Sequence, residues 1–387
     1  MEASEQLEIV SRGEDSHHQF KADATNVNSL AAEIVAFSNS GGGNILIGGG
    51  NDGTLQPHTF SSVTRLNRLI SNAAIHSCCP PVDPLTENVS VNDGIVVVVS
   101  VTDGLSKPYM DNIGSIWFKS GSDKRRVTSR EEMQRMFQSA QLVHGDDLPI
   151  SGATVADIDR DYFEAFFEKR FGSKLDAQEV SLAHILTSMR LVRDDSLTVA
   201  GALLFAKRPQ PLVPAFHVKA IAFPGNDIHA NKYLDSQDFV GNLESQFQDG
   251  LAFMTRNLHR SQQDQGVNAQ GQLEVPQLVF EELLANALIH RDFFVSAPIR
   301  IFVFSDRVEI VSPGHLPNNL TIENIKSGNS NMRNPILASY ATWVLPYRGL
   351  GTGVLRALKE YPEIDFVDDR DGNKFCAIIR RPAEQRR

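Results

Sequence analysis

Three polar side chains recur at every fourth position in one segment of the chain. They are Glu282, Asn286 and His290. Residues four apart lie on the same face of an α-helix, so a carboxylate, a carboxamide and an imidazole are expected in one row. A carboxylate beside a carboxamide suits Mg²⁺ and a water on nucleotide phosphates. The same row also suits a solvated polar face, and this segment alone leaves both interpretations open.

Two further segments strengthen the nucleotide interpretation. Residues 306–314 predict a strand that runs into a sharp turn at Ser312-Pro313-Gly314, and residues 348–356 predict a glycine loop that opens a helix. Bare backbone N–H groups at such a loop and at a helix N-terminus form an anion site. A lone glycine loop is weak evidence. The order of all three elements within residues 282–356 is more specific, and it predicts a phosphate-binding site.

The surrounding pattern predicts the elements that hold this site. In the C-terminal part we expect a helix over 276–290, a long loop before the glycine turn, and strands over 297–304, 307–311, 364–368 and 374–380. Upstream we expect helices over 157–170, 181–191 and 243–258, strands over 198–205 and 216–223, and a flexible loop over 260–272.

The first part of the chain predicts a smaller α/β domain. Leu30, Ile34 and Phe37 recur at helical spacing within 28–39, and a short buried strand follows over 44–47. Residues 63–75 predict a second helix, and 94–101 a strand with 113–119 as its hairpin neighbour. Ser129 is placed to cap a helix over 129–140, with Glu132 three residues on. The expected organisation is a domain over 1–140, a linker over 141–155, a helical connector over 156–200 and a second domain over 201–387.

Composition and charge limit the function classes. Of the 387 residues 41% are hydrophobic and 22% charged, which excludes a disordered chain, a collagen and a coiled-coil rod. No apolar run reaches the roughly 18 residues of a membrane helix, and with only 3 cysteines we expect a cytoplasmic protein without membrane contact. The net charge is -10, so any nucleic-acid contact must use a local patch. One basic cluster could be such a patch or a solvated loop: Lys119, Lys124, Arg125, Arg126 and Arg130.

The C-terminal motifs resemble the Bergerat-fold ATPases (the gyrase, heat-shock-ninety, histidine-kinase and MutL group). More specifically, they look like the divergent ATPase-like domain of bacterial ATP-binding transcriptional regulators. The matching text is ELLANALIHRDF over 282–293, IRIFVFSDRVEIVSPGHLP over 299–317, MRNP over 332–335 and GLGTGV over 349–354. The resemblance implies that Glu282 polarises the attacking water and that Asn286 holds Mg²⁺. The phosphate contacts fall to Gly349, Gly351 and Gly353.

One position departs from that group. Where it normally has an aspartate that contacts the adenine amino group, this chain has Ser312, followed by Gly314 in the same turn. A serine makes a weaker contact, so adenine preference, tight binding and hydrolysis all stay open. Arg333 and Arg348 are candidates to stabilise the negative charge of the phosphates. The alternative for each is a surface salt bridge.

The N-terminal part resembles the Schlafen-like AlbA domain. The residues that carry this resemblance are Glu14 with Gln19-Phe20-Lys21, then 34–48, 107–109 and 116–122. The resemblance implies binding of DNA or RNA, for which the leading candidates are Lys21, Lys107, Lys119 and Arg125. A dimerisation or scaffold module with solvated lysines is the alternative.

Related Schlafen domains include metal-dependent RNases that use three acids. Here Glu14 matches the first acid, Gln19 replaces the second, and Asp52 is the only acid near the third. Loss of one carboxylate weakens a site for a hard cation, so nuclease activity is not favoured.

We therefore expect an α/β (α+β) protein of two domains, with ATP and Mg²⁺ as cofactors and nucleic acid as partner. The expected function is an ATP-binding, at most weakly hydrolysing, DNA-binding transcriptional regulator. Bound nucleotide would order the loop 313–334 and change domain or subunit contacts in a homo-oligomer. A metal-dependent nuclease and a nucleotide-free assembly module are the rival classes.

Overall fold

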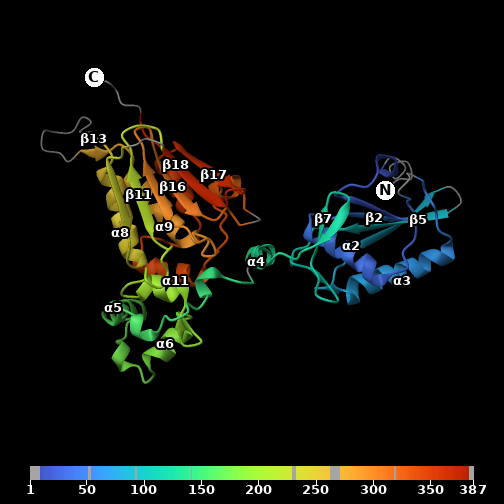
Figure 1. Cartoon of the computed structure of the whole chain (residues 1–387), viewed down its shortest axis with the longest axis horizontal. Helices are drawn as coiled ribbons and strands as arrows, with labels where there is room; N and C mark the ends of the chain where they lie inside the picture. Colours follow the sequence, from blue (N-terminus) through green and yellow to red (C-terminus); the bar gives the residue numbers. More distant parts are fainter. Residues whose placement is uncertain are drawn as a thin grey trace. The chain divides into compact units, whose positions relative to one another are not determined.

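The computed structural model describes residues 9–50, 54–91, 94–140, 142–228, 232–261, 271–317 and 320–382. The chain divides into two compact units, Met1–Val143 and His144–Arg387 (Figure 1). Both mix helices with sheets, so the α/β fold class and the two-domain organisation are confirmed. No helix among these residues combines the length and the apolar character that a membrane crossing needs.

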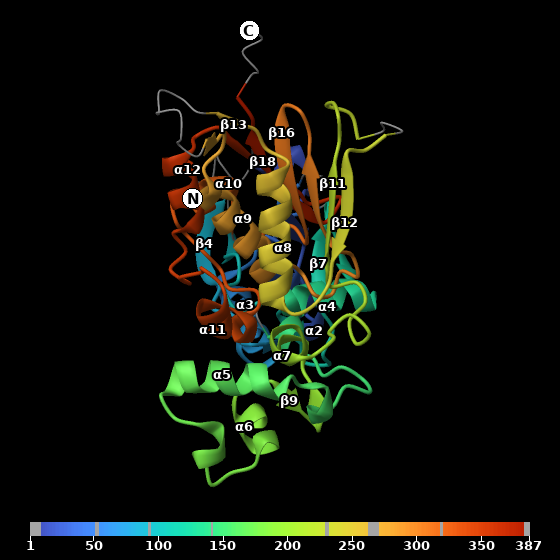
Figure 2. The same cartoon turned by 90° about the vertical axis from the view of Figure 1, so that its left-hand side faces the viewer.

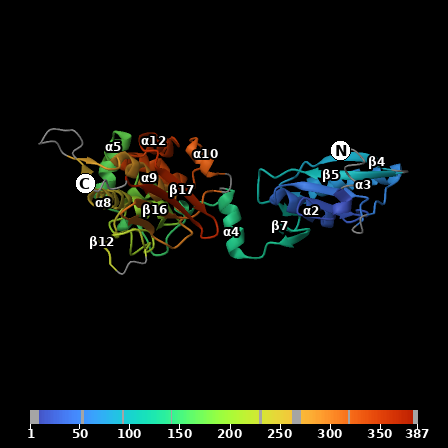
Figure 3. The ribbon, with the colours of Figure 1, turned by 90° about the horizontal axis from the view of Figure 1, so that it is seen from above.

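The first unit is built on a four-stranded sheet in the order β1-β2-β5-β4. Its strands are β1 (His18–Lys21), β2 (Gly43–Ile47), β4 (Leu85–Val91) and β5 (Gly94–Val101); β1 is parallel to β2 and the other pairs are antiparallel. Side chains alternate between the two faces. Ile45 and Ile47 pack under α2 (Val27–Asn39) and α3 (Phe60–His76), while Leu46 joins a smaller cluster on the other face. Figure 3 shows α2 and α3 beside β4 and β5.

A separate hairpin packs against α2 in the same unit. β7 (Trp117–Ser120) pairs with β8 (Asp123–Arg126), so the prediction that 113–119 neighbours the strand over 94–101 was wrong. The real neighbours of β5 are β2 and β4, because a sequence pattern fixes which residues are extended and not which strand they pair with. Two short strands, β3 (Cys78–Cys79) and β6 (Met110–Asp111), pair nearby, and α4 (Arg130–Ser139) follows with the predicted Ser129 cap.

The second unit contains a six-stranded sheet in the order β12-β11-β15-β16-β18-β17. Its strands are β11 (Val218–Ala222), β12 (Asp235–Phe239), β15 (Ile299–Val303), β16 (Arg307–Pro313), β17 (Ile364–Asp369) and β18 (Lys374–Arg380). Only β11 and β15 pair in parallel. The helices α8 (Leu243–Arg256) and α9 (Gln277–His290) lie along one face of this sheet (Figures 1 and 2). A small pair, β13 (Arg260–Ser261) and β14 (Gln272–Leu273), precedes α9, and residues 262–270 of the expected flexible loop lie outside the described residues.

The expected linker and connector belong to the second unit. From His144 onward the chain packs into this unit, and Asp146 and Ala153 are fully buried. Most of the predicted linker 141–155 is therefore part of the second unit. Short 3-10 turns (Gly145–Asp147, Val155–Asp157, Leu175–Ala177) lead through α5 (Arg160–Phe171), α6 (Leu182–Ser188) and the pair β9 (Val192–Arg193) and β10 (Ser196–Leu197). One continuous apolar cluster joins this region to the sheet, so 156–200 is no separate connector.

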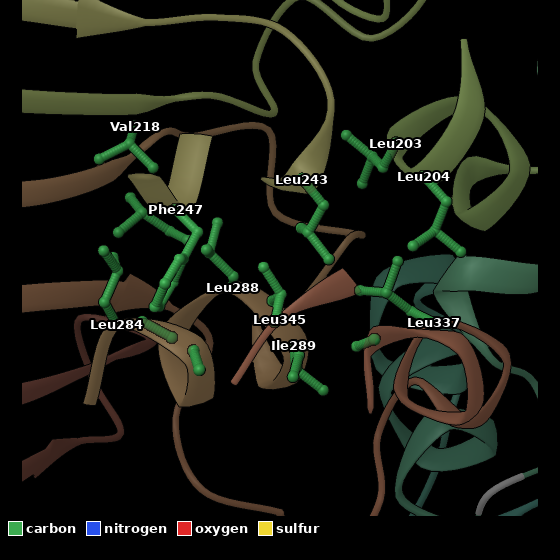
Figure 4. Packing of buried hydrophobic residues seen from close by; sticks show 14 of the residues in the cluster. Leu203, Leu204, Val218, Leu243, Phe247, Leu284, Leu288, Ile289, Leu337 and Leu345 are labelled. Atoms are coloured by element: carbon green, nitrogen blue, oxygen red, sulfur yellow. The ribbon is translucent and has the colours of Figure 1, made fainter. Parts of the chain in front are cut away.

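Residues 198–205 form the helix α7 (Val199–Phe205), so the predicted strand there was wrong. Thr198 accepts a hydrogen bond from Gly201 N and caps the helix, and every residue of α7 is buried. A short run that is apolar on all sides has no period, so pattern alone does not separate helix from strand. Figure 4 shows the result, with Leu203 and Leu204 of α7 near Leu337.

The predicted long loop also carries helices. α10 (Ile322–Lys326) and α11 (Pro335–Val344) lie between β16 and the glycine turn, and α12 (Gly353–Glu360) follows that turn as predicted. Asp146 Oδ2 accepts a hydrogen bond of 2.8 Å from Leu337 N at the start of α11. The loop is therefore shaped by contacts with distant residues.

Candidate functional site

One pocket in the second unit brings the C-terminal motifs together. It is lined by residues of α9, the end of β16, the following loop and the glycine turn before α12. All the residues that the sequence assigned to nucleotide line it: Glu282, Asn286, Ser312, Gly314, Arg333, Arg348, Gly349, Gly351 and Gly353. Residues far apart in sequence thus converge on one cavity.

Glu282 is a buried acid in the lining of this pocket. Its side chain is 3% exposed and its Oε1 lies 2.8 Å from Nη2 of Arg356. Burial raises the pKa of Glu282, and the positive charges of Arg356 and Arg348 oppose that rise. A carboxylate whose pKa is raised is a better proton acceptor, as a water-activating base requires.

The glycine turn approaches α9 very closely. A methyl group at Gly353 would lie 2.7 Å from Oε2 of Glu282 and 3.2 Å from Nδ2 of Asn286. Only a residue without a side chain allows this approach. The first N–H groups of α12 therefore lie beside the carboxylate and carboxamide, where a metal-bound phosphate would need them.

Ser312 stands where the related ATPases have an aspartate. It is 6% exposed, and its hydroxyl donates a hydrogen bond of 3.3 Å to the carbonyl oxygen of Ala287 in α9. Ser312 lines the pocket, and with its hydrogen engaged the hydroxyl oxygen keeps lone pairs that can accept hydrogen bonds. A serine so oriented keeps part of the aspartate's acceptor character without its charge.

The two candidate arginines differ in their surroundings. Arg333 donates to the carbonyl oxygens of His290 (3.3 Å) and His315 (2.7 Å), and burial lowers its pKa. Gly314, at φ +97°, leaves it room, because a methyl group there would lie 2.6 Å from Nη1 of Arg333. Arg348 is exposed and, within the described part of the chain, has no hydrogen-bond or ion-pair partner. Arg348 is thus the freer of the two cations to meet phosphate.

Two pocket residues were missed at the level of sequence. Arg356 lies one turn into α12, and only its place three residues after Gly353 signals it. Tyr347 directs its hydroxyl to Nε2 of His290 at 3.3 Å. Burial and Arg333 lower the pKa of His290 to about 4, so the third member of the polar row is a neutral imidazole.

The candidate nucleic-acid cations of the first unit all have partners. Lys107 lies 2.5 Å from Asp103, and Arg125 makes a two-point ion pair with Glu132. Lys21 lies 3.5 Å from Glu33, and Lys119 donates to Oε1 of Gln19 at 2.7 Å.

The nuclease candidates form no acidic cluster in the described residues. Glu14 accepts hydrogen bonds from the side-chain amide of Gln19 and from Phe20 N. Asp52 lies outside the described residues. In the part of the chain that is described, no group of three histidine, cysteine or acidic side chains is placed to hold a metal ion.

Comparisons with known proteins agree with both sets of motifs. Residues 14–128 match the family model "Schlafen, AlbA_2". Residues 296–375 match the model "Putative ATP-dependent DNA helicase recG C-terminal", a match that begins after α9. The chain joins a Schlafen AlbA_2 domain to an ATPase-like domain. Both resemblances are thereby confirmed.

Comparisons of the whole chain add little. No curated protein matches it. The crystal structure of the DIP2311 protein from Corynebacterium diphtheriae is 19% identical, with a TM-score of 0.45. That match covers 95% of this chain and 64% of the other, so this chain spans about two thirds of the length of that protein.

Proposed function

We propose that the AlbA_2/ATPase-like protein binds ATP with Mg²⁺ in its C-terminal pocket and associates with nucleic acid as a regulator. The observation that carries the nucleotide part is the meeting of the glycine turn with Glu282 and Asn286. A phosphate at the start of α12 would find backbone donors on one side and the metal-binding carboxamide on the other. No other described pocket combines these groups.

The chemistry at this site would rest on positioning. Bound Mg²⁺ would neutralise phosphate charge and orient the reacting oxygen atoms. Asn286 would hold the metal, Glu282 would polarise the attacking water, and Arg348 would reach the phosphates from the exposed side. Hydrolysis is expected to be slow at most, because Glu282 is paired with Arg356.

Adenine is the favoured base on the geometry of Ser312. Its oxygen accepts hydrogen bonds, and the exocyclic amino group of adenine donates them. Guanine has a hydrogen-bond acceptor, O6, in place of that amino group, so two acceptors would face each other.

Calorimetric titration of Mg-ATP into the wild type and Asn286→Ala tests the nucleotide part. Binding by the wild type, and loss of it in the variant, is expected. Binding by neither protein would contradict the proposal and leave an assembly module without nucleotide as the better description. Asn72→Ala, an amide of α3 in the other unit, is a control that should leave the titration unchanged.

The regulatory part concerns the loop 313–334, which connects two walls of the pocket. Ser330 lies against Gly351, where a methyl group would meet its Oγ at 2.8 Å, so a nucleotide on the glycine turn would stabilise the loop. Hydrogen exchange of residues 320–334 should slow on addition of Mg-ATP. Unchanged exchange in a protein that binds ATP would argue against this form of regulation. The expected homo-oligomer stays a separate prediction, which molar mass by light scattering tests.

A further inference from the structure

The hairpin β7–β8 places two like charges directly opposite each other. Lys119 pairs with Lys124 across the two strands, and Trp117 pairs with Arg126. Cross-strand partners in an antiparallel pair point to the same face, and opposed like charges destabilise it. One face of this short hairpin therefore gathers three cations, at a cost in stability.

A buried acid compensates part of that charge. Glu33 of α2 is 4% exposed, and its Oε1 lies 2.5 Å from Nζ of Lys124 and 3.5 Å from Nζ of Lys21. Its other oxygen, Oε2, is buried and has no hydrogen-bond partner among the described residues. The acid is held in place by lysines from two strands and retains unused capacity to accept a hydrogen bond.

Lys119, on the other strand of the hairpin, belongs to the same cluster of charges. Its Nζ donates to Oε1 of Gln19 at 2.7 Å and to the Ser122 carbonyl oxygen at 2.5 Å, and lies 4.9 Å above the ring of Phe37. Burial lowers the pKa of Lys119, and the nearby Glu33 and Glu14 oppose this. The ammonium group is thus fixed in direction by neutral oxygen atoms, and no carboxylate of the described residues forms an ion pair with it.

The charges in this cluster do not cancel. With Arg126, four cations (Lys21, Lys119, Lys124 and Arg126) face three carboxylates (Glu14, Glu33 and Asp123), which leaves one positive charge. Lys107 and Arg125, in contrast, each have an acid of their own. Lys21 and Lys124 keep 20% and 23% of their side chains exposed, so an anion can reach them. Arg126 is exposed on the same face and has no partner within the described residues.

We propose that Lys21, Lys119, Lys124 and Arg126 form a binding site for the phosphodiester backbone of nucleic acid. This inference rests on the proposed nucleic-acid association and assigns it to one face of one hairpin. A phosphate on that face relieves the repulsion between Lys119 and Lys124. Lysines that contact phosphate carry no base readout, so binding is independent of sequence and strongly dependent on salt.

Fluorescence anisotropy with the full chain tests the site. The probes are labelled oligo-dT and oligo-U of about 20 nucleotides and a DNA duplex of about 20 base pairs, each titrated between about 50 and 200 mM salt. Lys124→Gln and Arg126→Gln should each lower the slope of log K against log salt by about 0.7 to 0.9 and weaken binding about five- to eightfold near 0.1 M salt. The three probes then separate single-stranded RNA, single-stranded DNA and duplex as the source of the phosphate.

Two matched controls carry the same change in net charge. Lys107→Gln and Arg125→Gln remove cations that are paired elsewhere, and binding should change less than twofold. Equal losses in these controls and in the cluster variants would overturn the inference, because the attraction would then be diffuse. If the wild type binds the probes and every cluster variant binds them with the same affinity, the inference is overturned as well. A wild type that binds no probe would instead overturn the proposed nucleic-acid association itself.

Glu33→Gln supplies a test that a merely structural role cannot imitate. Removal of the compensating acid raises the excess charge of the cluster by one, so binding should tighten about five- to eightfold and the salt slope should steepen. The thermal midpoint should fall, because the opposed lysines lose their shared partner. Weaker binding by a folded Glu33→Gln protein would contradict the proposed site.

Discussion

Nη2 of Arg356 lies 2.8 Å from Oε1 of Glu282 inside the C-terminal pocket that we propose for nucleotide. The acid is 3% exposed and belongs to α9, whereas the arginine belongs to α12 and keeps 27% of its side chain exposed. The pair therefore links α12, which follows the glycine turn, to α9, which carries the amide proposed to bind the metal. It also occupies one oxygen of the proposed base.

Replacing Arg356 should change the titration of Glu282. In Arg356→Gln burial still raises the pKa of Glu282, but the largest opposing charge is gone, so this pKa should rise further. Unfolding should also become easier by about 2–3 kcal/mol, because a buried carboxylate loses its partner. Carbon-13 NMR of labelled glutamate carboxyls measures the first effect without any nucleotide. Arg348→Gln removes only a more distant charge and should raise the pKa of Glu282 less. An equal rise in both variants would show that Arg356 is not the main charge that opposes the effect of burial.

A side chain at Gly353 should damage nucleotide binding more than stability alone explains. The added methyl group of Gly353→Ala would press on Glu282 and Asn286, and overpacking of this kind costs about 1–3 kcal/mol. Gly172→Ala is the matched control: it strains a residue at φ +69° by about 1–2 kcal/mol, but it has no neighbour within 4 Å and does not line the pocket. Calorimetry should find Mg-ATP binding weakened about tenfold or more only in Gly353→Ala. Comparable losses in both variants would show that lost stability, and not contact with α9, governs binding.

The hydroxyl of Ser312 should set the base preference. Ser312→Ala removes a hydrogen bond worth about 1 kcal/mol to stability, and with it the hydroxyl acceptor of a pocket-lining residue. ATP and GTP should then compete equally for the variant, whereas the wild type should prefer ATP. Ser330→Ala, in the same pocket but against the glycine turn, should keep the wild-type preference. A preference that survives in Ser312→Ala would place base recognition elsewhere.

The buried Asp146 should make stability fall as pH rises from about 4 to 6. Burial raises the pKa of this carboxyl from 3.8 to about 6, so in this window the folded chain binds more protons than the unfolded chain. Asp146→Asn still accepts from Leu337 N but cannot ionise, and it should gain up to about 3 kcal/mol near pH 7.

His290 has the opposite effect on the same window. Its pKa is lowered to about 4, so its contribution to stability rises with pH up to about 6.5. With Asp146 replaced, the free energy of unfolding should therefore rise with pH across this window. Denaturant titrations at several pH values measure both proteins. Parallel curves for wild type and Asp146→Asn would refute the assignment.

The residues that the sequence assigned to nucleotide were predicted to lie together, and they line the proposed nucleotide pocket. Glu282, Asn286 and His290 were predicted on one helix face, and α9 places them so, because helical spacing is a local property. The order of the acid-amide helix, the Ser-Pro-Gly turn and the glycine loop sufficed to predict one cavity. What could not be read was Arg356, whose partner is 74 positions away along the chain, and the engaged hydroxyl of Ser312.

The candidate nucleic-acid cations, in contrast, could not be told apart from the sequence. Lys21, Lys107, Lys119 and Arg125 looked alike in the sequence, since each is a cation near a family motif. Only the register of the hairpin and the approach of α2 separate the lysines around Glu33 from the two paired cations. Local sequence determined the helices, the turns and the residue types of both sites, because these depend on neighbours within a few positions. The tertiary structure decided which charges are compensated, because a charge is neutralised by whatever folds against it.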